Sequence, residues 1–113
     1  MPSSNVRMMI EWFVPLGQTR AITMALHSIA ADTRAMRGCV GCSVATDIGS
    51  RGTMHYSEDW QTEDDLRLRL RSDTFSHLVA LMEDATEPPH IEFTLPHATR
   101  GLDFVEEVRA SAR

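Results

Sequence analysis

The residues best suited to chemistry lie between positions 54 and 75. Tyr56, Glu58 and Trp60 are spaced two apart, and alternate residues of a strand point to the same face. A carboxylate on a covered face needs a partner, and Arg69 on the following predicted helix is the candidate. The simpler interpretation is a structural ion pair. The functional one is that Arg69 or Glu58 handles the proton or the charge of a phenolate.

Helix start signals follow this strand at once. Thr62 can cap a helix, with Asp65 three residues later in a capping-box position. A second cap at Ser72 predicts a break or kink in the helix. The second segment should bury the apolar stripe Phe75, Leu78, Val79 and Met82. Two prolines in the stretch 86–89 end it.

The remaining elements follow from hydrophobic periodicity. We predict strands at 6–14, 39–48, 53–60 and 90–95, and a helix at 18–37 that ends before Gly38. A hairpin turn at 49–52 should join the second and third strands. The tail, 99–109, is expected to form a short helix around Leu102, Val105 and Val108.

This order predicts an α+β, ferredoxin-like βαββαβ fold with an antiparallel sheet. The chain is one domain, 1–113, with a core at about 6–95 and a C-terminal extension at 96–113. Helices cover one face of such a sheet, and the other face carries Met9 and Phe13, too apolar for a solvated surface. A second copy is the simplest cover, so we predict a face-to-face homodimer.

Composition restricts the partners. Eleven basic residues against sixteen acidic ones give a net charge of −5, which argues against nucleic-acid binding. No apolar run approaches the roughly 18 residues of a membrane span, and the N-terminus has no signal-peptide pattern. We therefore expect no membrane partner and a cytoplasmic protein with its two cysteines reduced.

The chain resembles the antibiotic biosynthesis monooxygenase family of dimeric α/β barrels. The resemblance covers about residues 6–95 and depends on features in order: the turn Pro15-Leu16-Gly17, the strand start Gly38-Cys39, the strand end Glu58-x-Trp60, and Ser72-x-x-Phe75. It implies a homodimer with a pocket between helices and sheet in each subunit. Characterised members include cofactor-free oxygenases of quinols and polyketide phenols, and a branch that degrades haem.

Two histidines that are common in the family are missing. One often stands three residues before the serine that corresponds to Ser72, where this chain has Arg69. The other often precedes the phenylalanine, where this chain has Thr74. Their absence puts inherited general-base chemistry in doubt. It also weakens a haem-ligand interpretation, although it leaves haem binding open, and His77 matches no ligand position.

We also predict a set of site residues around the pocket that the resemblance implies. The predicted substrate-binding residues are Trp60, Glu58, Phe75 and Trp12, and the predicted catalytic residues are Arg69, Tyr56 and His27. Tyr56 and Trp60 would form the wall of an apolar pocket, or they are core aromatics, which is the commoner use. His27 borders the pocket mouth or is plain surface, and surface is favoured.

The sequence Cys39-Val40-Gly41-Cys42 invites a redox interpretation. Redox pairs of this spacing sit at helix N-termini, where the dipole lowers a thiol pKa. This pair enters a strand, in which positions three apart should point to opposite faces, so we predict no redox role. The five histidines have no metal-ligand spacing, and we expect no metal and no other cofactor.

The sequence thus predicts a monooxygenase that uses oxygen, without metal or flavin, on a quinol or a phenolic or polycyclic aromatic substrate. Desolvation and a polar contact would favour the phenolate, and the protein would supply orientation and exclusion of water. The alternative is a non-catalytic, dimeric ligand-binding or stress-response module, which the missing histidines favour. An RNA-binding sheet is disfavoured by the negative charge.

Overall fold

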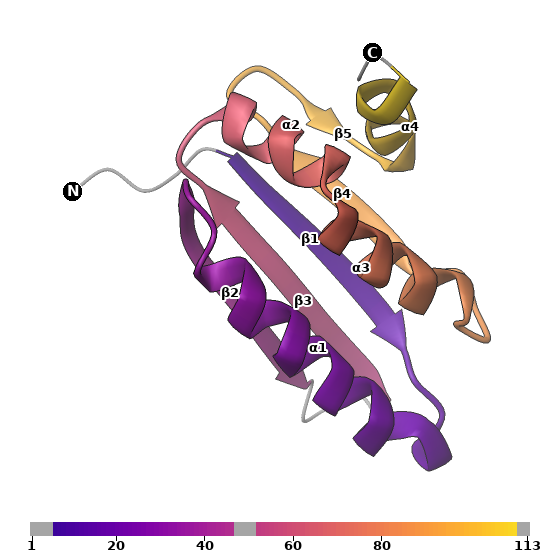
Figure 1. Ribbon diagram of the computed structural model, residues 1–113. Helices are drawn as coiled ribbons and strands as arrows, with labels where there is room; N and C mark the ends of the chain where they lie inside the picture. The colour runs from indigo at the N-terminus through magenta and orange to yellow at the C-terminus, as the bar shows by residue number, and fades with distance from the viewer. Residues whose placement is uncertain (1–5, 47–51, 111–113) are drawn as a thin grey trace.

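A computed structural model describes residues 6–46 and 52–110, and these form an antiparallel sheet with helices against one face (Figure 1). The strands are β1 (Val6–Phe13), β2 (Cys39–Thr46), β3 (Thr53–Trp60), β4 (His90–Thr94) and β5 (Thr99–Arg100), in the spatial order β2-β3-β1-β4-β5. The helices are α1 (Thr19–Arg34), α2 (Glu63–Arg71), α3 (Asp73–Glu83) and α4 (Leu102–Ala110), with a 3-10 turn η1 (Leu16–Gln18) before α1. The predicted α+β, ferredoxin-like arrangement is confirmed.

Strand β1 is central, as its apolar character predicts. It pairs with β3 on one side and β4 on the other, and its residues alternate between buried and exposed. The inward residues pack under the helices, whereas Met9 and Phe13 on the outer face are 39% and 46% exposed. The second apolar face of β1 is therefore not covered within this chain.

The predicted helix starts of α2 and α3 are confirmed. The Thr62 hydroxyl accepts a hydrogen bond from the Asp65 backbone N–H at 3.1 Å. The Ser72 hydroxyl accepts one from the Phe75 backbone N–H at 3.2 Å. Since Ser72 has extended backbone angles, the chain turns between the two helices, as the second cap predicts.

The tail differs from its prediction. Thr99 and Arg100 pair with β4 as an edge strand, and the helix begins only at Leu102. Leu102 is 53% exposed, and the buried residues of α4 are Phe104, Val105 and Val108. The prediction that Leu102 is inward was wrong, because the Phe104 ring takes the inward position and packs on Phe93 with centroids 5.0 Å apart.

Other boundaries shift by a few residues. Helix α1 ends at Arg34 rather than at position 37, and β4 ends at Thr94. Most of the predicted hairpin turn lies outside the described residues, which resume at Gly52. These shifts leave the order of elements unchanged.

Gly38 is one of two positions in the described residues where the backbone favours glycine. Its φ is +88°, and an added Cβ would lie 2.4 Å from the carboxyl carbon of Asp65. We expect Gly38→Ala to lower the free energy of unfolding by about 1–2 kcal/mol or more, because a side chain in this region is strained. Urea denaturation would measure it.

Gly17→Ala is the matched control. Gly17 has nothing within 4 Å of an added Cβ, and its φ is not positive. Its variant should be neutral or slightly stabilising. Equal losses of stability in the two variants would show that strain at Gly38 is not the cause.

Candidate functional site

The Glu58 carboxylate is the centre of a buried hydrogen-bond network. One oxygen accepts from the Tyr56 hydroxyl at 2.5 Å and from Arg69 Nη2 at 3.0 Å. The other accepts from Trp60 Nε1 at 3.0 Å and from Arg69 Nε at 3.2 Å. The predicted shared face of β3 and the predicted Glu58–Arg69 ion pair are therefore confirmed.

Arg69 is held by further contacts on both sides. Its Nη1 donates to Thr74 at 3.0 Å, and its Nη2 donates to the Thr33 hydroxyl of α1 at 3.0 Å. Its guanidinium carbon lies 5.5 Å from the centroid of the Phe75 ring. Burial acts to lower the pKa of Arg69, but the hydrogen bonds and charge of Glu58 outweigh it and raise that pKa. The pair joins β3 to α2, and the Thr33 contact of Arg69 extends the network to α1.

Tyr56 stays protonated in this network. Burial, followed by the charge of Glu58, raises the pKa of Tyr56 above its ordinary range. Its hydroxyl therefore acts as a hydrogen-bond donor to Glu58 near neutral pH. This geometry stabilises a fixed carboxylate rather than supplying a free base.

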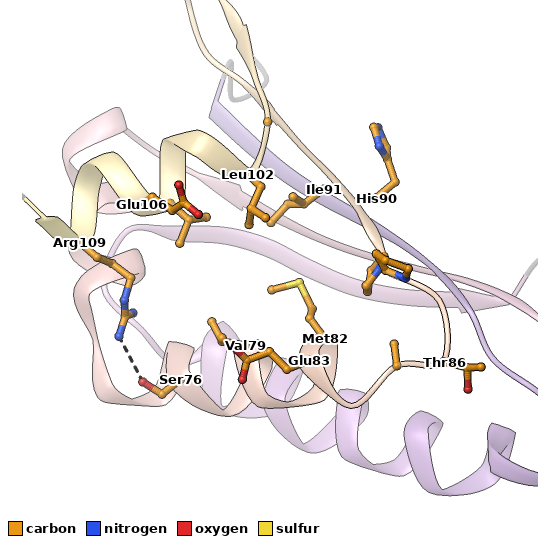
Figure 2. Close-up of a pocket in the computed structure, with 15 residues that line it drawn as sticks. Ser76, Val79, Met82, Glu83, Thr86, His90, Ile91, Leu102, Glu106 and Arg109 are labelled. Carbon is orange, nitrogen blue, oxygen red and sulfur yellow. Dashed lines mark hydrogen bonds between the residues drawn. The ribbon is translucent and has the colours of Figure 1, made fainter.

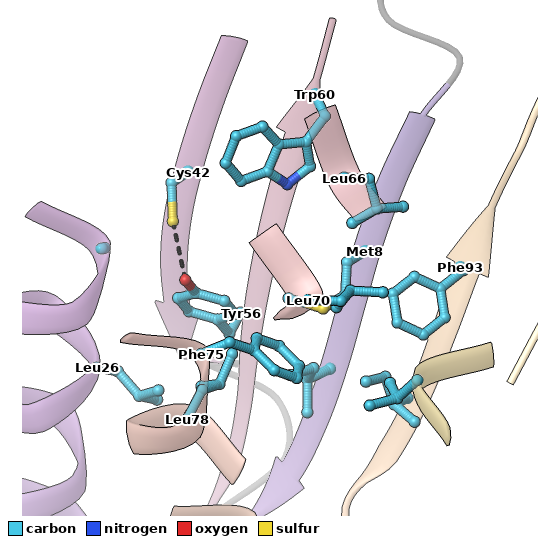
Figure 3. Close-up of a cluster of buried hydrophobic side chains, with 14 of the residues drawn as sticks. Met8, Leu26, Cys42, Tyr56, Trp60, Leu66, Leu70, Phe75, Leu78 and Phe93 are labelled. Carbon is cyan, nitrogen blue, oxygen red and sulfur yellow. Dashed lines mark hydrogen bonds between the residues drawn. The ribbon is translucent and has the colours of Figure 1, made fainter. Parts of the chain in front are cut away.

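The network is closed to solvent. Tyr56, Glu58, Trp60 and Arg69 are each at most 1% exposed, and they line none of the cavities described below. A substrate would have to displace packed side chains to reach them. Figure 3 shows Tyr56 and Trp60 among the buried hydrophobic side chains of the core.

The other predicted site residues lie in three different places. Phe75 is buried beside Arg69. Trp12 is also buried, opposite Met54 and toward the other end of β3 from Trp60. It borders a cavity of about 210 Å³, and its Nε1 has no hydrogen-bond partner among the described residues. His27 is exposed on α1 and is not part of the network. The structure thus joins Phe75 to the network but not Trp12 or His27.

A larger groove of about 820 Å³ lies between α3, β4 and α4 (Figure 2). Its lining is mostly apolar and includes Val79, Met82, Ile91, Leu102 and Val105. The Arg109–Ser76 hydrogen bond, 3.4 Å long, crosses from α4 to α3 at one end. Figure 2 shows the Met82 side chain reaching into the space between the elements, and the His90 ring pointing away from it. The volume is in the range of small-molecule sites.

Helix α4 is fixed firmly enough to serve as a wall. Arg109 Nη1 donates to the Leu70 carbonyl at 2.6 Å, and its guanidinium lies 5.9 Å from the centroid of the Phe75 ring. Arg67 of α2 lies 5.1 Å from the centroid of the Phe104 ring. Phe75 thus contacts one guanidinium from the buried network and one from the groove. The sequence did not predict this groove, because its second wall is α4. In that part of the chain the only sequence signal was apolar periodicity, which predicts a helix but not where it packs.

The two cysteines lie on one face of β2, contrary to the prediction. A β-bulge between Cys39 and Gly41 places Cys39 opposite Trp60 and Cys42 opposite Glu58, both inward-facing residues. The additional residue, Val40, is exposed. The Cys42 thiol donates to the Tyr56 hydroxyl at 3.3 Å (Figure 3). Burial raises the pKa of both thiols, that of Cys42 to about 11. A raised pKa disfavours the thiolate that redox chemistry needs, so the prediction of no redox role now depends on burial and not on opposite faces.

Cys42 should therefore react slowly with iodoacetamide. At pH 8 a pKa near 11 leaves a thiolate fraction about a hundredfold below that of an ordinary cysteine. We expect alkylation of Cys42 to be at least about tenfold slower in the folded protein than in urea. Mass spectrometry of the peptide that contains Cys42 measures the two rates. A native rate equal to the unfolded rate would contradict the buried position.

The described residues contain neither a candidate metal centre nor a candidate membrane span. Within 6–46 and 52–110, no group of three or more His, Cys, Asp or Glu is placed to hold a metal ion. Over the same ranges, no helix combines the length and the apolar character needed to cross a membrane.

Comparison with known proteins places this geometry in a family. The antibiotic biosynthesis monooxygenase family matches residues 5–81, and no curated protein matches the sequence. A conserved protein from Methanosarcina mazei Go1 has a similar structure, with a TM-score of 0.72 at 19% identity over 80% of this chain and 90% of that one. A protein from Shewanella oneidensis gives 0.71 at 18% identity over 88% and 94%.

A third structure carries a functional name. It is described as an antibiotic biosynthesis monooxygenase and has a TM-score of 0.68 at 14% identity, over 79% of this chain and 95% of that one. Likeness at these identities shows the shared fold, and the family match covers well over half of the chain. From its sequence match, supported by its fold, this chain belongs to the antibiotic biosynthesis monooxygenase family.

Proposed function

We propose that this protein is a monooxygenase that oxidises a quinol or an electron-rich phenol with molecular oxygen, without a bound metal or flavin. Family membership supports the reaction class. The observation that carries the assignment of a site is the mostly apolar groove between α3, β4 and α4, because its volume of about 820 Å³ suits a flat aromatic molecule.

The chemistry needs no external reductant. A hydroquinone and one oxygen molecule give a hydroxyquinone and water, so one oxygen atom enters the ring and the substrate supplies all the electrons. The protein would bind the aromatic ring, exclude water and favour the phenolate, which transfers the first electron to oxygen. These tasks require apolar walls and a cation near the phenolic oxygen rather than a prosthetic group.

Arg109 is the candidate for that cation. It lines the groove and is held in place by the Leu70 carbonyl and by Ser76. Arg69, the anion partner predicted from the sequence, already pairs with Glu58 at 3.0 Å and is closed to solvent. In our proposal, Arg69 and Phe75 support the groove from behind, and Arg109 faces the substrate.

Oxygen consumption tests the proposal. Purified protein is mixed with a small panel of hydroquinones and polycyclic phenols in the presence of a metal chelator. We expect uptake above the rate of autoxidation with at least one of them. If the folded protein consumes no oxygen with any of these compounds, the proposed oxygenase function is rejected.

A non-catalytic ligand-binding module is the second candidate. The specific observation in its favour is the network at Glu58, because it closes the interior where the family resemblance places the substrate. Such a module would bind aromatic ligands in the groove without consuming oxygen. Binding measured together with uptake separates the two functions.

We also propose that the protein is a cytoplasmic homodimer that joins its sheets face to face. The support is the outer face of β1, where Met9 and Phe13 are exposed on the central strand, since patches of this kind mark interfaces. Light scattering after size exclusion should give a dimer at micromolar concentration, and Phe13→Asp should shift it toward monomer. A monomeric wild-type protein would refute the dimer.

A further inference from the structure

We propose that Glu83 and Glu106 make the groove selective for an aromatic substrate that carries a positively charged substituent, such as a primary amine. The aromatic nature of the substrate rests on the proposed function. The charge preference rests on the two carboxylates themselves.

The two carboxylates face the groove from opposite walls. Glu83 is on α3 and Glu106 is on α4, and both line the cavity (Figure 2). Both are exposed, and within 6–46 and 52–110 neither has a hydrogen bond or an ion pair. Their neighbour Glu107, in contrast, pairs with Arg100 at 2.9 Å. The groove therefore presents an apolar floor with an unpaired carboxylate on each of two walls.

Among the described residues, the nearby cations form no ion pair with Glu83 or Glu106. Arg109 lies at one end of the groove, where it donates to the Leu70 carbonyl and to Ser76. Arg100 is bound to Asp103 and Glu107. The His90 ring points away from the groove (Figure 2). A ligand with a cationic substituent therefore finds two unpaired carboxylates in the groove, in addition to the Arg109 guanidinium that faces its phenolic oxygen.

The polarity of the site follows from this arrangement. A phenolic oxygen would lie toward Arg109, and an amine would lie between Glu83 and Glu106. Because both carboxylates are exposed, each should contribute only up to about fivefold in affinity at low salt. An anionic substituent is repelled as well, so cationic and anionic analogues should differ by about tenfold or more.

Three matched naphthohydroquinones test this inference, with an aminomethyl, a hydroxymethyl and a carboxymethyl substituent. Their dissociation constants are measured by calorimetry without oxygen, so that binding is read separately from turnover. The aminomethyl compound should bind about tenfold more tightly than the carboxymethyl compound. The difference should shrink as salt is added.

Variants assign the preference to the two residues. Glu83→Gln/Glu106→Gln should bring the ratio of the two dissociation constants close to one. The control Glu87→Gln/Asp32→Asn changes the net charge equally at exposed positions that do not line the groove, and it should keep the wild-type ratio. An unchanged ratio in the first variant, or equal binding of the three compounds to wild type, overturns the inference.

The inference and the proposed function fail in different ways. Charge-selective binding without oxygen uptake would leave the selectivity in place and remove the oxygenase. Oxygen uptake without charge selectivity would support the oxygenase and reject the role of Glu83 and Glu106. Absence of binding by all three compounds would also reject the charge-selective groove.

Discussion

Replacing Arg69 by leucine should lower the free energy of unfolding by about 3–5 kcal/mol, because it leaves the Glu58 carboxylate buried without its counter-charge. Glu58 is fully buried, and only the Tyr56 hydroxyl and the Trp60 indole N–H would remain among its hydrogen-bond donors seen here. Urea denaturation followed by circular dichroism measures the change from the shift in midpoint, provided that the slope is unchanged.

A double-mutant cycle shows whether the pair acts as a unit. Glu58→Leu/Arg69→Leu should be less destabilised than the sum of the two single variants, since neither charge is then left alone. Glu63→Gln is the control, because Glu63 pairs with Arg67 at 2.9 Å and both side chains are partly exposed, and it should cost at most about 1 kcal/mol. An Arg69→Leu variant as mild as this control would show that Glu58 reaches another partner.

The Glu58 network was predictable because its parts obey local rules. A period of two places Tyr56, Glu58 and Trp60 on one face of β3, and a buried carboxylate must find a partner. The helix caps at Thr62 and Ser72 set the phase of α2, so that Arg69 points at Glu58. None of these inferences needed a contact between distant parts of the chain, apart from the ion pair itself.

The resemblance to the family predicted the network less well than it predicted the fold. It places the pocket wall at Trp60, but in this chain Arg69 stands where the family often has histidine. Its long side chain reaches Glu58, Thr33 and Thr74. These contacts close the space beside Trp60, which is almost fully buried. The side chain of Arg69 thus fills part of the interior, which hydrophobic periodicity alone does not predict.

Two further features could not be predicted from a local sequence pattern: the strand register at the bulge and the position where α4 packs. The bulge at Val40 shifts the strand by one residue and brings Cys39 to the same face as Cys42. The groove depends on where α4 packs, and that is fixed by Arg109 on the Leu70 carbonyl, 39 residues away in sequence. In a helix as short as α4, the phase of the apolar stripe is also ambiguous, which is why Leu102 was misplaced.

Filling the groove should slow the proposed reaction without unfolding the protein. Met82→Trp places an indole where the flexible Met82 side chain now reaches into the groove (Figure 2). We expect kcat/KM for oxygen uptake to fall at least about tenfold, since the ring of the substrate would lose its apolar contacts. Trp60→Ala is a poorer test, because removing a buried tryptophan costs about 3–5 kcal/mol and confuses binding with folding.

Met24→Trp is the matched control for Met82→Trp. Met24 is an exposed methionine on α1 and does not line the groove, so the same substitution there should leave kcat/KM unchanged. Urea midpoints of the two variants confirm that both are folded. If Met82→Trp keeps wild-type turnover, the substrate binds elsewhere. The interior beside Trp60 would then be the next candidate, and the buried Glu58–Arg69 pair would have to separate to admit the substrate.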